Sequence, residues 1–310
     1  MSESFSSPGI DPPSSTLSAR LRELANYLSA PAAGRLTEEQ RALSLGIARR
    51  LVADVAVRLD GGINPDGLWS EWLRGGLPGA DRLAGICFTR AEEHRWREQS
   101  VQRSVLPILA ASDDAVADAP AVGEPLSDVD RAYLAFQIAE RRRFDALGNP
   151  ALAVADLDAD IFRALLLDIA AWRLAEVSAD QSRAERLGDA VRVAIERQAG
   201  EAGIARAGAD YYAILGAGAT DVAANAIARH NWPVLIALAA AAHRRAYDDM
   251  ALALLTAESA ALPSLLAPLR LDRTALAPLE ASLAMLPARA VADGSGADHA
   301  DPSPPRQGER

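Results

Sequence analysis

An apolar run of eleven residues, Trp232–Ala242, constrains the fold of this chain more than any other feature. A helix that spans a membrane needs about 20 predominantly apolar residues, so this run is too short to cross one. Asn231 is placed to cap a helix, and Pro233 suits a first turn. Two arginines follow the run, where their positive charges interact favourably with the negative end of the helix dipole. The sequence therefore predicts a helix of a soluble protein, buried on nearly every side.

Residues that favour helices dominate the rest of the chain. Alanine, leucine and arginine are abundant, whereas the aromatic residues that strands favour make up only 5%. Thr37 and Gln40 have the spacing of a capping box, and apolar residues from Leu43 to Val55 then recur on one helical face. We predict an all-α fold, arranged either as stacked helical hairpins of an α-solenoid, HEAT-like, or as an irregular helical bundle.

Glycine- and proline-rich breakers separate the predicted helices. The first is indicated by an apolar stripe at Leu17, Leu21, Leu24 and Leu28. The others lie at about 37–60, 68–76, 80–111, 127–147, 159–177, 180–199, 219–229, 232–245, 247–257 and 273–286. The segment 80–111 contains one or two helices, because Pro107 disturbs its last part.

The same breakers suggest how the chain is organised. Residues 1–15 and 288–310 are polar, lack apolar periodicity and are expected to be disordered tails. An acidic, proline-containing linker at 112–126 then separates an N-terminal helical part, 16–111, from a C-terminal helical-repeat part, 127–287.

Charge and residue usage exclude several kinds of chemistry. All 32 basic residues are arginine, so no lysine is present to form a Schiff base or to serve a P-loop or kinase site. Cys87 is the single cysteine, which rules out an intrachain disulfide and a zinc site of several cysteines. The net charge of −10 argues against nucleic acid as a partner. The N-terminus does not read as a secretory signal, so the expected location is cytoplasmic.

A short word recurs along the chain. LSLGIA (43–48), LAFQIA (134–139) and LLLDIA (165–170) share leucine, isoleucine and alanine at fixed offsets. The word indicates either a helical repeat or the chance recurrence of residues in amphipathic helices, since periodicity alone imposes this spacing.

Two segments carry a resemblance to a known family. LTEEQRALSLGIARRLVADVAVRLDG, with Asp54, Val55 and Arg58 as its D-V-x-x-x-R element, and WPVLIALAAAAHRRAYDDMALALL resemble an uncharacterised alphaproteobacterial family with HEAT-like helical repeats. The resemblance covers 37–60 and 205–286. It implies an α-solenoid and brings no known activity. This chain departs from the family's pattern at Asp60 and Gly61, where a Val-Arg-x-x-Leu-Ala element would follow.

Acidic residues form the main candidate metal site. Asp113, Asp114 and Asp118 resemble the clusters with which all-α isoprenoid synthases hold Mg²⁺ and a diphosphate, and Asp248 with Asp249 is the only second motif available. The alternative is a solvated acidic loop.

A second acidic group precedes the helix at 159–177. Asp156, Asp158 and Asp160 open like a calcium loop, but the positions that need Gly and Glu hold Ile161 and Leu167. Helix capping explains them better.

Other candidate sites have simpler structural readings. YYAILGAGATD (211–221) mimics a dinucleotide-binding turn, but Asp221 replaces its third glycine, and the alternative is a helix end followed by a helix that Thr220 caps. Trp69 and Trp72 are expected to be core anchors, and Cys87 a buried thiol rather than a nucleophile.

Basic residues and histidines complete the candidates. The run Arg141–Arg143 ends a helix and suits its dipole, with an acidic partner or a phosphate as the alternative use. His94, His230, His243 and His299 are too scattered to predict a site.

Two functional hypotheses remain. In the first, the protein is a non-enzymatic interaction or regulatory scaffold that binds another protein through a helical surface. In the second, it is an all-α metal-dependent enzyme or a small-molecule or lipid binder of isoprenoid-synthase type. No residue is assigned a catalytic, cofactor-binding or metal-binding role.

Overall fold

The protein is described by a computed structural model that covers residues 20–22, 24–25, 36–108, 126–176 and 181–289. The α-helices are α2 (Glu38–Leu59), α3 (Pro65–Gly75), α4 (Ala80–Ile108), α5 (Asp128–Arg141), α6 (Ala159–Glu176), α7 (Gln181–Gly200), α8 (Ile204–Leu215), α9 (Ala219–Ala228), α10 (Trp232–His243), α11 (Tyr247–Thr256), α12 (Leu262–Leu265) and α13 (Ala277–Ala284). The 3₁₀ turns are η1 (Val154–Asp156), η2 (Gly216–Gly218), η3 (Ala267–Leu269) and η4 (Arg273–Leu276). The all-α prediction is confirmed: these ranges contain no strand beyond one isolated bridge, Phe144–Pro150.

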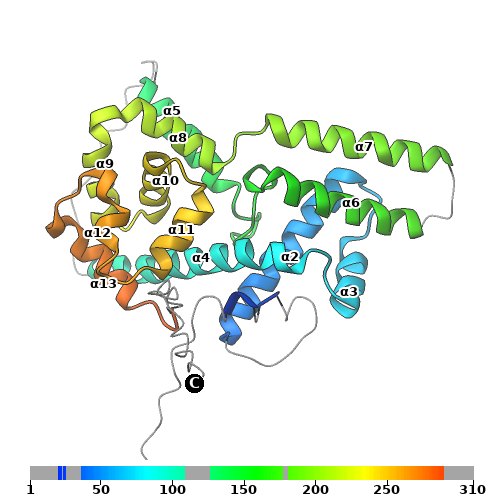
Figure 1. Ribbon diagram of the computed structural model, residues 1–310, viewed down its shortest axis with the longest axis horizontal. Coiled ribbons are helices and arrows are strands. Elements are labelled where there is room, and N and C mark those ends of the chain that lie inside the picture. Colours follow the sequence, from blue (N-terminus) through cyan, green and yellow to red (C-terminus); the bar gives the residue numbers. More distant parts are fainter. Residues whose placement is uncertain (1–19, 23, 26–35, 109–125, 177–180, 290–310) are drawn as a thin grey trace, which may run out of the picture.

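Two apolar cores share the long helix α4. The first core joins α2, α3, the first half of α4, α6 and α7, and the second joins Trp96 of α4 with α5 and with α8 to α13. Figure 1 shows α4 extending across the molecule, from the group at the left that contains α10 and α11 towards α2 and α3 at the right. The cores interleave along the chain, because α5 belongs to the second core whereas α6 and α7 return to the first.

Helix α10 lies inside the second core, as the apolar run predicts. All nine residues of Trp232–Ala240 are buried, and α8, α9, α11 and η3 pack around the helix. Small residues permit the close approach: a Cβ on Gly208 of α8 would lie 2.8 Å from the Cβ of Ala237. Across the described ranges, no helix is long and apolar enough to span a membrane.

Local capping explains where several helices begin. Thr37 and Gln40 form the predicted capping box at the start of α2, and the Ser127 hydroxyl accepts from the Asp130 amide at the start of α5. Asn231 precedes α10, but its side chain makes no capping hydrogen bond. The prediction for Thr220 is wrong, because α9 begins at Ala219 and Thr220 lies inside its first turn.

Other sequence predictions differ from the structure in detail. Helix α8 was not among the predicted helices, although its end at Gly216 was expected. The repeated word falls on α2, α5 and α6, but its isoleucine is buried at Ile47 and Ile169 and half exposed at Ile138. A shared word therefore does not give a shared environment.

Candidate functional site: a buried ionic cluster and its loop

Arg143 lies at the centre of a buried ionic cluster. Its guanidinium donates to both carboxylate oxygens of Glu93, with N–O distances of 2.8 Å each. Asp156 and Asp248 approach the same guanidinium to 3.5 and 3.6 Å. Its central carbon lies 4.7 Å from the ring centroid of Tyr247, whose hydroxyl donates to Glu93 at 2.8 Å. Helix α4, the chain after α5, η1 and α11 are therefore joined through one side chain.

Arg90 completes this group, which we call the Arg143 cluster: Arg90, Glu93, Arg143, Asp156, Tyr247 and Asp248. One nitrogen of Arg90 lies 3.6 Å from Glu93. Its other nitrogens donate to the main-chain oxygens of Arg143, at 2.9 Å, and Ala151, at 3.1 Å. The side chains of Arg90 and Arg143 are almost completely removed from water. Buried charges need such partners, because desolvation of an isolated ion is very costly.

The cluster contains two guanidinium groups and three carboxylates, and their pKa values reflect this imbalance. Burial would raise the pKa of Glu93, but Arg143 and Arg90 hold it below its ordinary value. Burial raises the pKa of Asp248 to about 6, with only partial opposition from Arg143. Burial also raises the pKa of Asp156. Burial and Arg143 lower the pKa of Arg90 to about 10.

Asp156 connects the cluster to the start of α8. Its Oδ1 accepts from the Ile204 amide at 2.6 Å, so it caps a helix distant in the sequence. A Cβ on Gly203 would lie 2.4 Å from that oxygen, and glycine is therefore needed for the close approach. The other oxygen of Asp156 and the Nε of Arg143 are buried without a hydrogen bond, although they lie only 3.5 Å apart.

The cluster holds the loop that follows α5, residues 143–151, which we call the braced loop. Arg90 donates to its two ends, and Arg50 of α2 donates to the Pro150 oxygen at 2.7 Å. Within the loop, Asp145 accepts from the amides of Leu147 and Asn149, at 2.9 and 2.8 Å. The loop is thus fixed both from inside and from neighbouring helices.

The tip of the braced loop is exposed and apolar, in contrast to the buried charges that hold the ends of the loop. Gly148 has φ +84°, a left-handed conformation that favours glycine. The adjacent Leu147 is 88% exposed, more than any other large hydrophobic residue in the described ranges. At the base of the loop, two guanidinium groups lie over the ring of Phe144, with the central carbon of Arg90 at 4.8 Å and that of Arg97 at 4.9 Å from the ring centroid.

An open cleft of about 540 Å³ separates the braced loop from α2. Its lining includes the charged residues Arg50, Arg142 and Asp145 together with Leu152 and several alanines. Arg58, which also lines the cleft, pairs with Asp54 at 3.2 Å and with Glu201 at 3.1 Å. Charges of both signs line the cleft, and most of them already pair with each other.

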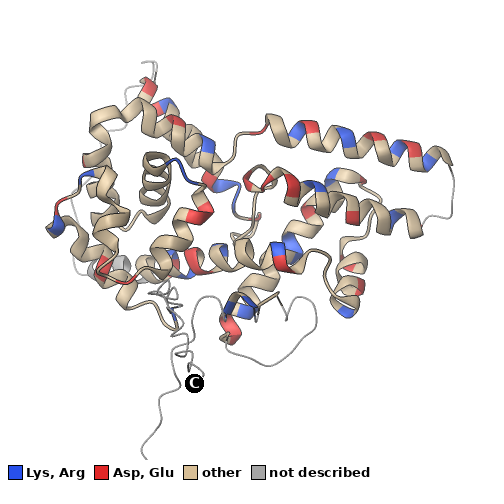
Figure 2. Cartoon of the chain, viewed as in Figure 1, with Lys and Arg blue, Asp and Glu red and all other residues tan. Residues whose placement is uncertain are grey.

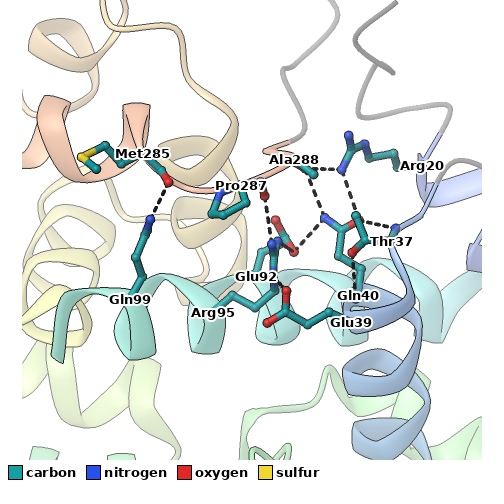
Figure 3. Close-up of polar contacts among 10 residues, drawn as sticks. All are labelled: Arg20, Thr37, Glu39, Gln40, Glu92, Arg95, Gln99, Met285, Pro287 and Ala288. Carbon is teal, nitrogen blue, oxygen red and sulfur yellow. Dashed lines mark hydrogen bonds and ion pairs between the residues drawn. The ribbon is translucent and has the colours of Figure 1, made fainter. Parts of the chain in front are cut away.

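A second polar cluster holds the chain after α13, as Figure 3 shows. Arg95 donates to the Pro287 oxygen at 2.9 Å, and Gln40 donates to the Ala288 oxygen at 3.3 Å. Arg20 also donates to the Ala288 oxygen, and Gln99 donates to that of Met285. Buried Glu92 accepts from Arg95 and Gln40 at 2.7 and 3.1 Å. Four side chains thus bind main-chain oxygens, which fastens this segment to α2 and α4.

No family model, curated protein or solved structure matches this chain.

The predicted acidic motifs do not come together in the structure. Asp113, Asp114 and Asp118 lie outside the described residues. Asp248 faces Arg143 inside the cluster, whereas Asp249 is exposed. Within the described ranges, no group of three His, Cys, Asp or Glu side chains could hold a metal ion.

The remaining candidates have local roles. Asp158 accepts from the amides of Asp160 and Ile161, which confirms its capping role at α6. The strand that a dinucleotide fingerprint requires is absent, because residues 211–215 belong to α8. Trp69 and Trp72 are buried, as expected of core anchors.

Cys87 and the histidines in the described part of the chain each have their own local contacts. Cys87 is buried, and burial together with Asp248 raises its pKa to about 12, which suits a small apolar residue and not a nucleophile. His243 lies 2.8 Å from the Leu265 oxygen, whereas His94 and His230 contact aromatic rings, those of Phe144 and Trp232. His299 lies outside the described residues.

The Arg143 cluster is the feature that the sequence analysis missed. The run Arg141–Arg143 was assigned as a whole to the end of a helix. The structure divides it, because Arg141 and Arg142 face water whereas Arg143 is 1% exposed. No local pattern distinguishes the third arginine from the other two, because its ion-pair partners are distant in the sequence. Glu93 lies 50 residues before Arg143, whereas Asp156 and Asp248 lie 13 and 105 residues after it.

Proposed function

We propose that this protein is a non-enzymatic scaffold that binds another protein, and that the braced loop is one of its contact points. The observation that carries the proposal is Leu147, an apolar side chain 88% exposed at the tip of a loop whose main chain is firmly held. Surfaces of helical proteins commonly serve this kind of role.

The bracing gives a physical reason why the loop suits recognition. A loop that is already fixed loses little conformational entropy when a partner binds, so more of the contact energy appears as affinity. Full burial of one leucine contributes about 1.5–3 kcal/mol. The Arg143 cluster and Arg50 hold the main chain of the braced loop in place, so the buried charges support recognition at the surface of the molecule.

The charges around the loop favour a particular partner. Arg142 is exposed at the base of the loop, and it forms no ion pair within the described part of the chain. An acidic partner surface would neutralise it and gain charge-assisted hydrogen bonds. The proposed partner therefore presents an apolar pocket for Leu147 beside acidic residues.

Site-specific photo-crosslinking tests the proposal. A benzoylphenylalanine in place of Leu147 should capture a partner in cells, whereas the same group at Val193, an exposed apolar position on α7, should not. The captured protein is then purified, and its Kd is measured by calorimetry with the wild type, Leu147→Ser and Val193→Ser. We expect Leu147→Ser to weaken binding by about tenfold or more, and Val193→Ser to have no effect. Equal affinity for all three proteins would refute a role for the loop.

A further inference from the structure

The outer face of α5 is a separate surface with an unusual pattern. Ala132 and Phe136 point inward, and the helix packs against α8 on this side. Leu134 and Ile138, spaced i and i+4, lie together on the opposite face, where they are 45% and 49% exposed. Two large apolar residues therefore form the middle of an outward-facing stripe.

Charges of opposite sign lie at the two ends of the same stripe. Asp130 is in the first turn of α5, and Arg141 is its last residue. Both side chains are exposed, and Arg141 forms no ion pair within the described ranges. Arg131, at the edge of the stripe, is already paired with Asp128. The stripe is acidic at its start, apolar at its centre and basic at its end.

This order is complementary to itself when two copies of the helix run antiparallel. A twofold axis near Phe136 would place Leu134 of one copy against Ile138 of the other, and Asp130 against Arg141 of the second copy. Like charges would meet in a parallel pair, so the charge pattern selects the antiparallel one. Such an interface uses the same patch on both subunits, as twofold dimers do. We propose that the protein forms a homodimer through the outer face of α5, independently of the braced loop.

Charge reversal tests this pairing directly. We expect the wild type to sediment as a dimer at about 100 µM. Asp130→Arg and Arg141→Asp should each weaken the dimer by about tenfold or more, because each sets like charges against one another twice. The double variant, with both changes, should return close to the wild-type affinity.

Two further variants separate dimerisation from folding. Arg163→Asp, an exposed change on α6, is the matched control and should leave the dimer intact. Leu134→Gln with Ile138→Gln should give a monomer whose circular dichroism spectrum and melting temperature match those of the wild type. A wild type that stays monomeric at about 100 µM would overturn the proposal. So would a dimer that the single charge reversals leave unchanged, or a double variant that fails to recover.

Discussion

Glu93 and Arg143 form a doubly hydrogen-bonded ion pair whose side chains are almost completely shielded from water. The two N–O distances are both 2.8 Å, and the side chains are 3% and 1% exposed. Glu93 lies on α4 between Ala91, which belongs to the first core, and Trp96, which belongs to the second. The pair therefore fastens the braced loop to the stretch of helix where the two cores meet.

Breaking this pair should destabilise the fold strongly. Glu93→Gln leaves the Arg143 guanidinium with less compensation in a buried site, and we expect a loss of about 3–5 kcal/mol in the free energy of unfolding. The matched change at the surface is Arg192→Ala, which removes the exposed ion pair with Asp189 and should cost less than about 1 kcal/mol. Guanidinium chloride denaturation measures both. Similar losses for the two variants would show that the buried pair contributes no more to the free energy of unfolding than the exposed pair does.

Asp248 should give the stability a particular dependence on pH. An aspartate in an unfolded chain has a pKa of about 3.9, and burial raises the folded value to about 6. The folded state therefore binds this proton more tightly, so this residue's contribution to stability increases as the pH falls from about 6 to about 4 and is lost again as the pH rises.

Asp248→Asn tests the sign of this effect. The variant cannot ionise, so its free energy of unfolding should exceed that of the wild type by up to about 3 kcal/mol near pH 8. The difference should shrink towards zero below about pH 4. Urea denaturation across this pH range measures it. A difference that does not change with pH would contradict a raised pKa for Asp248.

Two glycines should respond to alanine in opposite ways. Gly208 lies where α8 meets α10, and an added Cβ would lie 2.8 Å from the Cβ of Ala237, so Gly208→Ala should cost about 1–3 kcal/mol. Gly188 lies within α7 with no atom within 4 Å of an added Cβ, so Gly188→Ala should gain about 0.5–1 kcal/mol. Thermal melting should shift down for the first and up for the second. A shift in the same direction for both would argue against this packing of α8 on α10.

Leucines of α10 should be important for stability. Leu235 and Leu238 are completely buried, so truncation of either to alanine should cost about 2–5 kcal/mol. Ile214→Ala, on the half-exposed side of α8, is the comparison and should cost less than about 1 kcal/mol. Chemical denaturation of the three variants checks the ranking. Silent leucine variants would refute the buried position of α10.

Much of the helical architecture can be predicted from residues that are close in the sequence. The capping box at Thr37 and the cap at Ser127 act across three residues, and the apolar run of α10 predicts that this helix is buried. Such signals are local because helix hydrogen bonds and side-chain neighbours lie within about four positions of one another. The all-α class and the main helix positions therefore follow from the sequence alone.

The candidate site depended on the tertiary structure. Arg141, Arg142 and Arg143 share one sequence context, yet only the third turns inward to Glu93, Asp156 and Asp248. The word around Ile138 matches those around Ile47 and Ile169, yet Ile138 alone is half exposed. The sequence by itself determined most of the helical segments, although not α8, because that choice is made largely by near neighbours. Only the tertiary structure decided which faces are buried and which charges meet, because those choices depend on partners brought together from distant parts of the chain.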